Sequence, residues 1–244
     1  MRPTRTPQLY PLSPMRCPTT VTLVPPLLAA LVDHGRICEA ADALIDRMRH
    51  PEPVAYHELA LPLADDFWLR FVGLGDRDCE RLLLQHIDAG QVPALFARCH
   101  DLYEARTQEG LPLRPGILDL LQLLHDHGIA RAVATSTRQP RASRKLAAAG
   151  LLPFFEVVVT SSDVSHPKPA PDIYLLAAQK LGKDPARCLA LEDSPAGIRA
   201  AVGAGMTAIQ VPDLVHPDDD LRALGHRIVD SLADAHTLLL PHLW

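Results

Sequence analysis

The sequence predicts an α/β fold: a doubly wound parallel sheet with an inserted α-helical domain. Three observations support this prediction. After about residue 112, apolar runs of strand length alternate with helical segments. These runs are apolar throughout, which is typical of strands that are buried on both faces in a parallel sheet. Residues 36–108, in contrast, show only helical spacing of apolar residues.

The amino-terminal part divides into three predicted regions. Residues 1–19 contain five prolines, so a disordered leader is expected there. The run Thr-Val-Thr-Leu-Val at 20–24 is predicted to be a first short strand, and the core would comprise 20–35 and 112–244. Residues 36–108 would form a helical cap, and the segment Gly-Leu-Pro-Leu-Arg-Pro-Gly at 110–116 would be the hinge behind it.

The remaining core elements follow in order along the chain. Glycine follows several of the predicted helices, as expected where a helix stops. Helices are predicted at 116–128, 141–150, 171–182 and 195–205, strands at 154–163, 187–193 and 207–211, a strand ending in Thr-Ser-Thr at 130–135, and a last short strand and helix at 227–239.

Composition excludes several classes of protein. The formal net charge of −5 gives no basic surface for nucleic acid. Five scattered cysteines, with no Cys-x-x-Cys pair, argue against a disulfide framework or a zinc site and suit a reducing cytoplasm. No apolar run approaches the roughly 20 residues of a membrane-spanning helix. A secretion signal is disfavoured because Pro25 and Pro26 interrupt the apolar segment near the amino terminus. A cytoplasmic monomer is expected.

Polar residues follow three of the predicted strands, where ligands collect in sheets of this kind. Thr135, Ser136 and Thr137 end the first of these strands, and their hydroxyl and N–H groups suit a phosphate. The alternative is an ordinary helix cap. Lys168 stands between two prolines that stiffen its backbone, so its ammonium could be held to neutralise a phosphate or a carboxylate. The alternative is a surface lysine.

Adjacent carboxylates, Glu192 and Asp193, end the third strand in the stretch Leu-Ala-Leu-Glu-Asp-Ser-Pro-Ala-Gly. Hard oxygen ligands at one loop suit Mg²⁺, which takes one or two carboxylates together with water and substrate phosphate. The alternative is a pair of acids that is favoured by the dipole of the following helix. The occurrence of hydroxyl, lysine and acid pair on successive strands favours a joint site.

Three motifs in order along the chain resemble those of the haloacid dehalogenase superfamily, in its phosphatase and β-phosphoglucomutase-like branch. They are Val-Ala-Thr-Ser, Lys-Pro-Ala-Pro-Asp and Leu-Glu-Asp-Ser-Pro-Ala-Gly-Ile-Arg-Ala-Ala. The resemblance covers roughly 60–240. It implies a Rossmann-like core with a helical cap, and Mg²⁺-dependent hydrolysis of a small phosphate monoester or sugar phosphate. By the same resemblance, Thr135, Ser136 and Lys168 bind the phosphate, and Glu192 with Asp193 holds Mg²⁺. The first strand would lie between those bearing Thr135 and the acid pair.

The first motif of this family, Asp-x-Asp-Gly after the first strand, is not found. In the family its first Asp is the nucleophile and its second the general acid/base. An ungapped alignment puts Pro26 and Leu28 in their places, and neither side chain can attack or carry a proton. Two other pairs, Asp76 with Asp78 and Asp218 with Asp220, lie in a presumed cap segment and a polar loop, and both are interpreted as solvated turns.

Three explanations of the missing motif stay open: a catalytically inactive pseudoenzyme, a displaced amino-terminal reading frame, or another Asp in the nucleophile's role. The expected partner is a small phosphorylated metabolite. The alternative function is binding of a phosphometabolite or a protein partner without catalysis.

Overall fold

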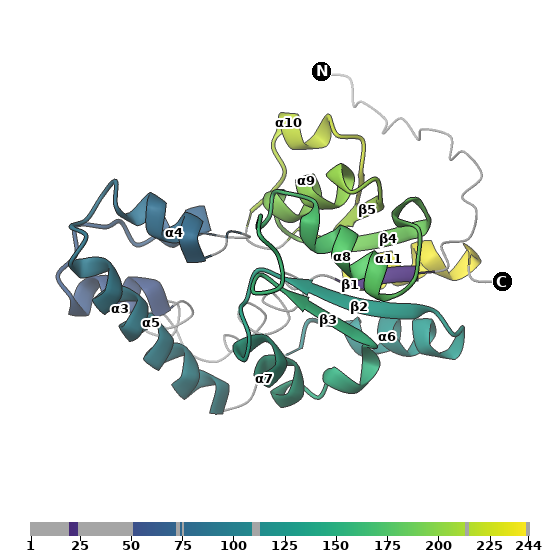
Figure 1. Ribbon diagram of the computed structural model, residues 1–244, viewed down its shortest axis with the longest axis horizontal. Coiled ribbons are helices and arrows are strands. Elements are labelled where there is room, and N and C mark those ends of the chain that lie inside the picture. Colours follow the sequence, from purple (N-terminus) through teal and green to yellow (C-terminus); the bar gives the residue numbers. More distant parts are fainter. Residues whose placement is uncertain are drawn as a thin grey trace, which may run out of the picture.

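The computed structural model shows two parts, a helical lobe and a sheet with helices on both of its faces (Figure 1). The predicted leader at 1–19 and the segment 24–35, which was assigned to the core, lie outside the described residues. The structure describes residues 20–23, 51–71, 74, 76–108, 113–212 and 215–242.

The helical lobe comprises the described residues between 51 and 108. It has its own apolar core, which Tyr56, Phe67, Leu83 and Leu95 help to form. Within that part of the chain the structure contains helices and no strand. Its elements are α3 (Pro51–Glu58), the 3₁₀ helix η1 (Phe67–Phe71), α4 (Asp76–Leu83) and α5 (Gln91–Gln108).

The described strands form one sheet in the order β3-β2-β1-β4-β5-β6, and each neighbouring pair is parallel. The predicted central place of the first strand, between the strands that carry Thr135 and the acid pair, is therefore confirmed. The strands are β1 (Thr20–Leu23), β2 (Ala130–Thr135), β3 (Val157–Thr160), β4 (Cys188–Glu192), β5 (Thr207–Gln210) and β6 (Arg227–Ile228).

Successive residues of the buried strands alternate between two apolar layers, which explains why the strands are apolar throughout. On β4, Leu189 and Leu191 pack in one layer, whereas Cys188 and Ala190 pack in the other. The first layer contains side chains from α6 (Ile117–Asp126), α7 (Arg141–Ala148) and α11 (Leu232–Leu239). The second contains side chains from α8 (Asp172–Lys180), α9 (Pro195–Gly203) and α10 (Asp219–Arg222). Both faces of the sheet are thus covered, as in a doubly wound fold.

Three local predictions are corrected by the structure. Strand β3 is shorter than the predicted 154–163, because Leu152–Phe154 form a 3₁₀ helix and Asp163 accepts hydrogen bonds from the Thr160 N–H and hydroxyl. The segment interpreted as a polar turn at Asp218 and Asp220 contains the short helix α10, whose Leu221 N–H donates to Asp218 at 2.8 Å. Asp76 and Asp78 likewise lie in a helix, α4, and Asp78 pairs with Arg81. None of the helices in the described ranges could cross a membrane.

Helix α9 approaches the end of β4 closely at Gly197. Ser194 caps this helix by accepting from the Gly197 N–H at 3.1 Å. A Cβ added at Gly197 would lie 1.7 Å from Oε1 and 1.9 Å from Cδ of Glu192. The Glu192 carboxylate cannot yield easily, because both of its oxygens accept hydrogen bonds from buried donors. The position therefore requires glycine for space.

We expect Gly197→Ala to lower the free energy of unfolding by about 3 kcal/mol or more, since the new methyl displaces a buried, paired carboxylate. Gly203→Ala in the same helix is the matched control, because a Cβ added there would come no closer than 3.7 Å to its nearest neighbour, Pro171. Its free energy of unfolding should stay unchanged or rise by up to about 1 kcal/mol. Urea denaturation of both variants measures the difference, and equal stabilities would contradict the steric assignment.

Candidate functional site

The predicted site residues come from two strand ends and one loop at the carboxyl edge of the sheet. Thr135 is the last residue of β2, and Glu192 is the last residue of β4. Asp193 follows Glu192 directly, and Lys168 lies in the loop between β3 and α8. Because all strands of the sheet are parallel, the polar residues that follow them share one edge.

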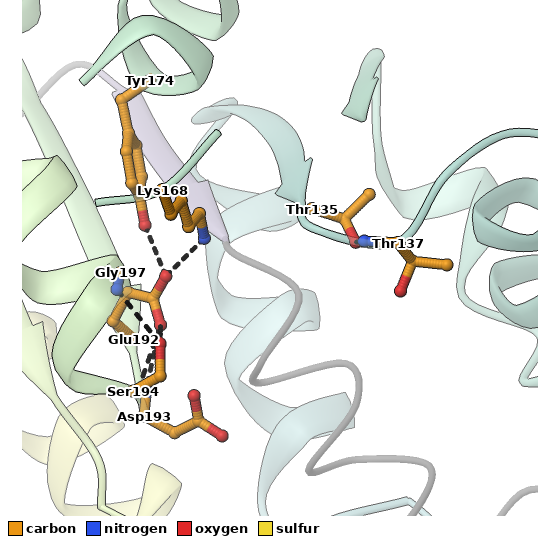
Figure 2. Close-up of polar contacts among 8 residues, drawn as sticks. All are labelled: Thr135, Thr137, Lys168, Tyr174, Glu192, Asp193, Ser194 and Gly197. Atoms are coloured by element: carbon orange, nitrogen blue, oxygen red, sulfur yellow. Dashed lines mark hydrogen bonds and ion pairs between the residues drawn. The ribbon is translucent and has the colours of Figure 1, made fainter. Parts of the chain in front are cut away.

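Lys168 and Glu192 form a buried ion pair. The Lys168 ammonium donates to Glu192 Oε1 at 2.5 Å, and neither side chain is accessible to solvent (Figure 2). The sequence predicted that Lys168 and Thr135 both lie close to the acid pair. This contact shows Lys168 held against Glu192 rather than free on the surface, and the roles of these residues stay predictions. Burial of two opposite charges requires such a pairing, since either one alone would be strongly disfavoured.

Protein donors occupy the whole carboxylate of Glu192. Oε1 accepts from Lys168 and from the Tyr174 hydroxyl at 2.9 Å. Oε2 accepts from the N–H groups of Asp193 and Ser194 and from the Ser194 hydroxyl, at 3.1, 3.3 and 3.1 Å. A carboxylate offers about four lone-pair positions, so five donors leave Glu192 little capacity for a further ligand.

Asp193 presents its carboxylate differently. The residue is 5% exposed, and Figure 2 shows its carboxylate pointing away from the contact between Lys168 and Glu192. The backbone carbonyl of Asp193 accepts from Gln210 Nε2 at 3.2 Å, which helps to fix the loop. No group of three or more His, Cys, Asp or Glu side chains among the described residues is arranged to hold a metal ion.

The hydroxyl residues after β2 form a turn. Thr135 is 2% exposed, and its Oγ1 accepts from the Thr137 N–H at 2.7 Å. The Ser136 carbonyl accepts from the Ser161 hydroxyl at 2.7 Å, which ties this turn to the loop after β3. Thr135 and Thr137 stand apart from the group around Glu192 in Figure 2. The capping alternative is wrong for these residues, because the next helix, α7, begins at Arg141 with Pro140 at its N-cap and no side-chain cap hydrogen bond. Phosphate binding by these residues stays a prediction.

Burial perturbs the two groups that contact Glu192. Burial lowers the pKa of the Lys168 ammonium, and the carboxylate of Glu192 opposes that change. Burial, with the nearby charge of Glu192 as a further cause, raises the pKa of the Tyr174 hydroxyl well above its ordinary value. Tyr174 is therefore a neutral donor at physiological pH.

A cavity of about 370 Å³ lies between the two lobes. One wall is Arg77 from α4 of the helical lobe, and the other includes Arg138 and the loop after β3. Two guanidinium groups and several hydroxyls make this cavity suitable for an anionic, polar molecule. Its lining residues are Arg77, Arg138, Ser161, Ser162, Val164, Ser165 and Pro167.

Sequence reasoning did not find Arg77, Arg138, Tyr174 or Gly197 as site residues. The two arginines come from separate lobes, and only the fold brings them to one cavity. Tyr174 lies 18 residues from its partner, Glu192. Its position in the predicted helix at 171–182 did not mark it as a site residue, since an aromatic residue on a buried helix face is common.

Comparisons with known proteins identify relatives of this chain. A family model described as haloacid dehalogenase-like hydrolase matches residues 28–205. Protein CbbY of Rhodobacter capsulatus is 35% identical over 175 residues, which cover 67% of this chain and 76% of that protein. Hexitol phosphatase A of Escherichia coli strain K12 is 41% identical over 132 residues, which cover 52% of this chain and 60% of that protein.

A solved structure extends the comparison to the fold. The crystal structure of a CbbY mutant from Rhodobacter sphaeroides, in complex with xylulose-(1,5)bisphosphate, aligns with a TM-score of 0.70 and 26% identity. The alignment covers 88% of this chain and 95% of that one. The predicted doubly wound fold and the family resemblance are both confirmed. Because the family model matches well more than half of the length of this chain, the chain belongs to the haloacid dehalogenase-like hydrolases.

Proposed function

We propose that the carboxyl edge of the sheet is a Mg²⁺-dependent site for a small phosphorylated sugar or a similar phosphate monoester. The observation that carries this proposal is the buried contact between Lys168 and Glu192, with Asp193 next to it and Thr135 at the same edge. Hydrolysis of the monoester is the reaction that such a site serves in this family. A cytoplasmic location and a monomeric state remain predictions.

The charges at the strand ends support a requirement for a cation. Lys168 and Glu192 neutralise each other, and Asp193 adds a further carboxylate at this edge. A phosphate dianion brings more negative charge to the same edge, which a cation would offset. The Asp193 carboxylate is a hard oxygen donor at a strand end, which fits Mg²⁺, and Mg²⁺ commonly takes its other ligands from water and phosphate.

The contacts of Glu192 change its proposed role. Because five protein donors occupy its oxygens, Glu192 is better suited to hold Lys168 than to bind the metal. Asp193 is then the described residue that would hold Mg²⁺, which when bound would neutralise phosphate charge. Lys168 and the Thr135 hydroxyl would orient the phosphate oxygens by donating hydrogen bonds to them.

The cavity beside Pro167 supports the substrate class. Its two arginines and three serines could donate hydrogen bonds to the hydroxyl groups, or to a second phosphate, of a phosphorylated sugar. Two relatives point in the same direction, since one is named a hexitol phosphatase and the other binds xylulose-(1,5)bisphosphate. The identity of the sugar would depend on contacts within this cavity.

Hydrolysis also needs an attacking group. In the expected reaction a carboxylate oxygen bonds to phosphorus while the ester oxygen leaves with a proton, and water then releases phosphate from the carboxylate. The residues that follow β1 in sequence, Val24, Pro25 and Pro26, offer no carboxylate. Four acids occur in the segment 24–50, which lies outside the described residues, and they are the candidates nearest in sequence for an attacking group: Asp33, Glu39, Asp42 and Asp46.

Binding without turnover is the second candidate function. The run Val-Pro-Pro after β1 favours it, because loss of a covalent nucleophile has reduced turnover by on the order of 10⁶ in a well-studied enzyme. The two candidates share one binding site and differ only in whether bond cleavage follows.

We expect the chain to bind a phosphate ester in the presence of Mg²⁺ and to hydrolyse a generic aryl phosphate no faster than a blank. The reason is that Lys168, Thr135 and the metal position a phosphate but supply no attacking atom. Calorimetric titration measures binding, and release of the aryl alcohol measures turnover. Robust turnover by the parent would overturn the second candidate, and substitution of the four acids one at a time would then identify the nucleophile.

A variant that restores the motif tests the same idea from the other side. Pro26→Asp combined with Leu28→Asp and Ala29→Gly introduces the missing carboxylates, so Mg²⁺-dependent hydrolysis of the aryl phosphate should appear. The parent, assayed in parallel, is the control. If the variant binds phosphate as the parent does and still shows no turnover, the alignment of Pro26 with the nucleophile is wrong.

We expect Asp193→Asn to weaken Mg²⁺ binding by about 10-fold or more, since the proposed ligand loses its charge. Asp119→Asn, an exposed acid on α6, is the matched control and should bind Mg²⁺ like the parent. Calorimetric titration with MgCl₂ measures both affinities. Equal Mg²⁺ affinity in Asp193→Asn and the parent would remove Asp193 from the proposed site.

A further inference from the structure

Tyr174 contacts both members of the buried ion pair. Its hydroxyl donates to Glu192 Oε1 at 2.9 Å, the same oxygen that accepts from the Lys168 ammonium. The Lys168 Nζ atom also lies 5.0 Å from the centroid of the Tyr174 ring. The residue is fully buried, and Figure 2 shows its side chain beside that of Lys168. One aromatic side chain therefore fixes the ammonium and its counter-ion together.

The shared oxygen has an electrostatic consequence. Two donors on Oε1 compete for one centre of negative charge, and the neutral hydroxyl takes part of it from Lys168. The three donors on Oε2 act in the same direction. Lys168 is thus paired well enough to be buried. Its electrostatic interaction with Glu192 is weakened by the other donors, so its positive charge is only partly neutralised by this carboxylate.

The geometry also limits where Lys168 can donate. An ammonium has three N–H groups, of which one is used by Glu192 and another direction is covered by the Tyr174 ring. The ring face attracts the cation without accepting a conventional hydrogen bond. What remains of the donor capacity of Lys168 is therefore held in a restricted orientation, which favours binding of an oxyanion in one pose.

We propose that Tyr174 is a positioning residue for phosphate binding: it acts through Lys168 and Glu192 and holds the ammonium in one orientation. This assignment rests on the proposed function of the same site. Tyr174 need not touch the ligand, so it is not a catalytic residue. The positioning role depends on its hydroxyl and not on its ring alone.

The test is Tyr174→Phe, which keeps the ring and removes only the hydroxyl. Without this donor Lys168 is drawn more strongly to Glu192, so we expect the affinity for inorganic phosphate in the presence of Mg²⁺ to fall about 2- to 10-fold. The affinity for Mg²⁺ alone should stay within about twofold of the parent, because the lost hydroxyl donates to Glu192, which the proposed function does not assign to the metal. Calorimetric titration well below the Tm of each variant gives both values.

Tyr56→Phe is the matched control. Tyr56 is a buried tyrosine of the helical lobe, and its hydroxyl has no hydrogen-bond partner among the described residues. This variant should bind phosphate and Mg²⁺ like the parent, which shows that loss of a buried tyrosine hydroxyl does not itself weaken binding. A thermal melt of each variant separates effects on folding from effects on the site.

The outcomes are distinct. Weaker phosphate binding by Tyr174→Phe, with Mg²⁺ binding and Tyr56→Phe unaffected, supports the assignment. A lower Tm with unchanged or tighter phosphate binding overturns it, since Tyr174 would then be structural only. Failure of the parent itself to bind phosphate in the presence of Mg²⁺ overturns the proposed function, and the role of Tyr174 with it.

Discussion

The arrangement at the carboxyl edge of the sheet depends on one buried ion pair. Lys168 and Glu192 are both inaccessible to solvent, and neither could be buried without the other. The pair joins the loop after β3 to the end of β4, two segments that β2 and β1 separate in the sheet. Gly197 leaves the space that the carboxylate occupies, so the packing of α9 and the charge pairing are parts of one constraint.

This constraint also explains why the acids at the end of β4 have different environments. Glu192 is surrounded by donors from Lys168, Tyr174 and its own loop, whereas the Asp193 carboxylate points the other way. Two adjacent carboxylates can coexist because the first is neutralised inside the protein. The proposed function assigns the second carboxylate, that of Asp193, to a cation.

Much of the sheet could be predicted from the sequence, because apolar runs between glycines mark buried strands directly. The strand at 130–135 has the predicted bounds, and the central place of β1 followed from the family resemblance. Strand β3 and helix α10 were misjudged where side chains compete with the backbone, since Asp163 ends the strand and Asp218 caps the helix. The lysine and the acids were found because they directly follow strands or stand between prolines. Tyr174 and the two cavity arginines were missed, because their partners are set by how helices and lobes pack.

The cavity beside Pro167 has walls on two separately packed parts of the molecule. Arg77 belongs to the helical lobe, which has its own apolar core, while Arg138 and the three serines belong to the sheet side. Because both lobes bound this space, a rotation of one lobe over the other would widen or narrow it. Entry, enclosure and release of a ligand would then be governed by a single rigid-body motion, and exchange would be sensitive to solvent viscosity and to the length of the connections between the lobes.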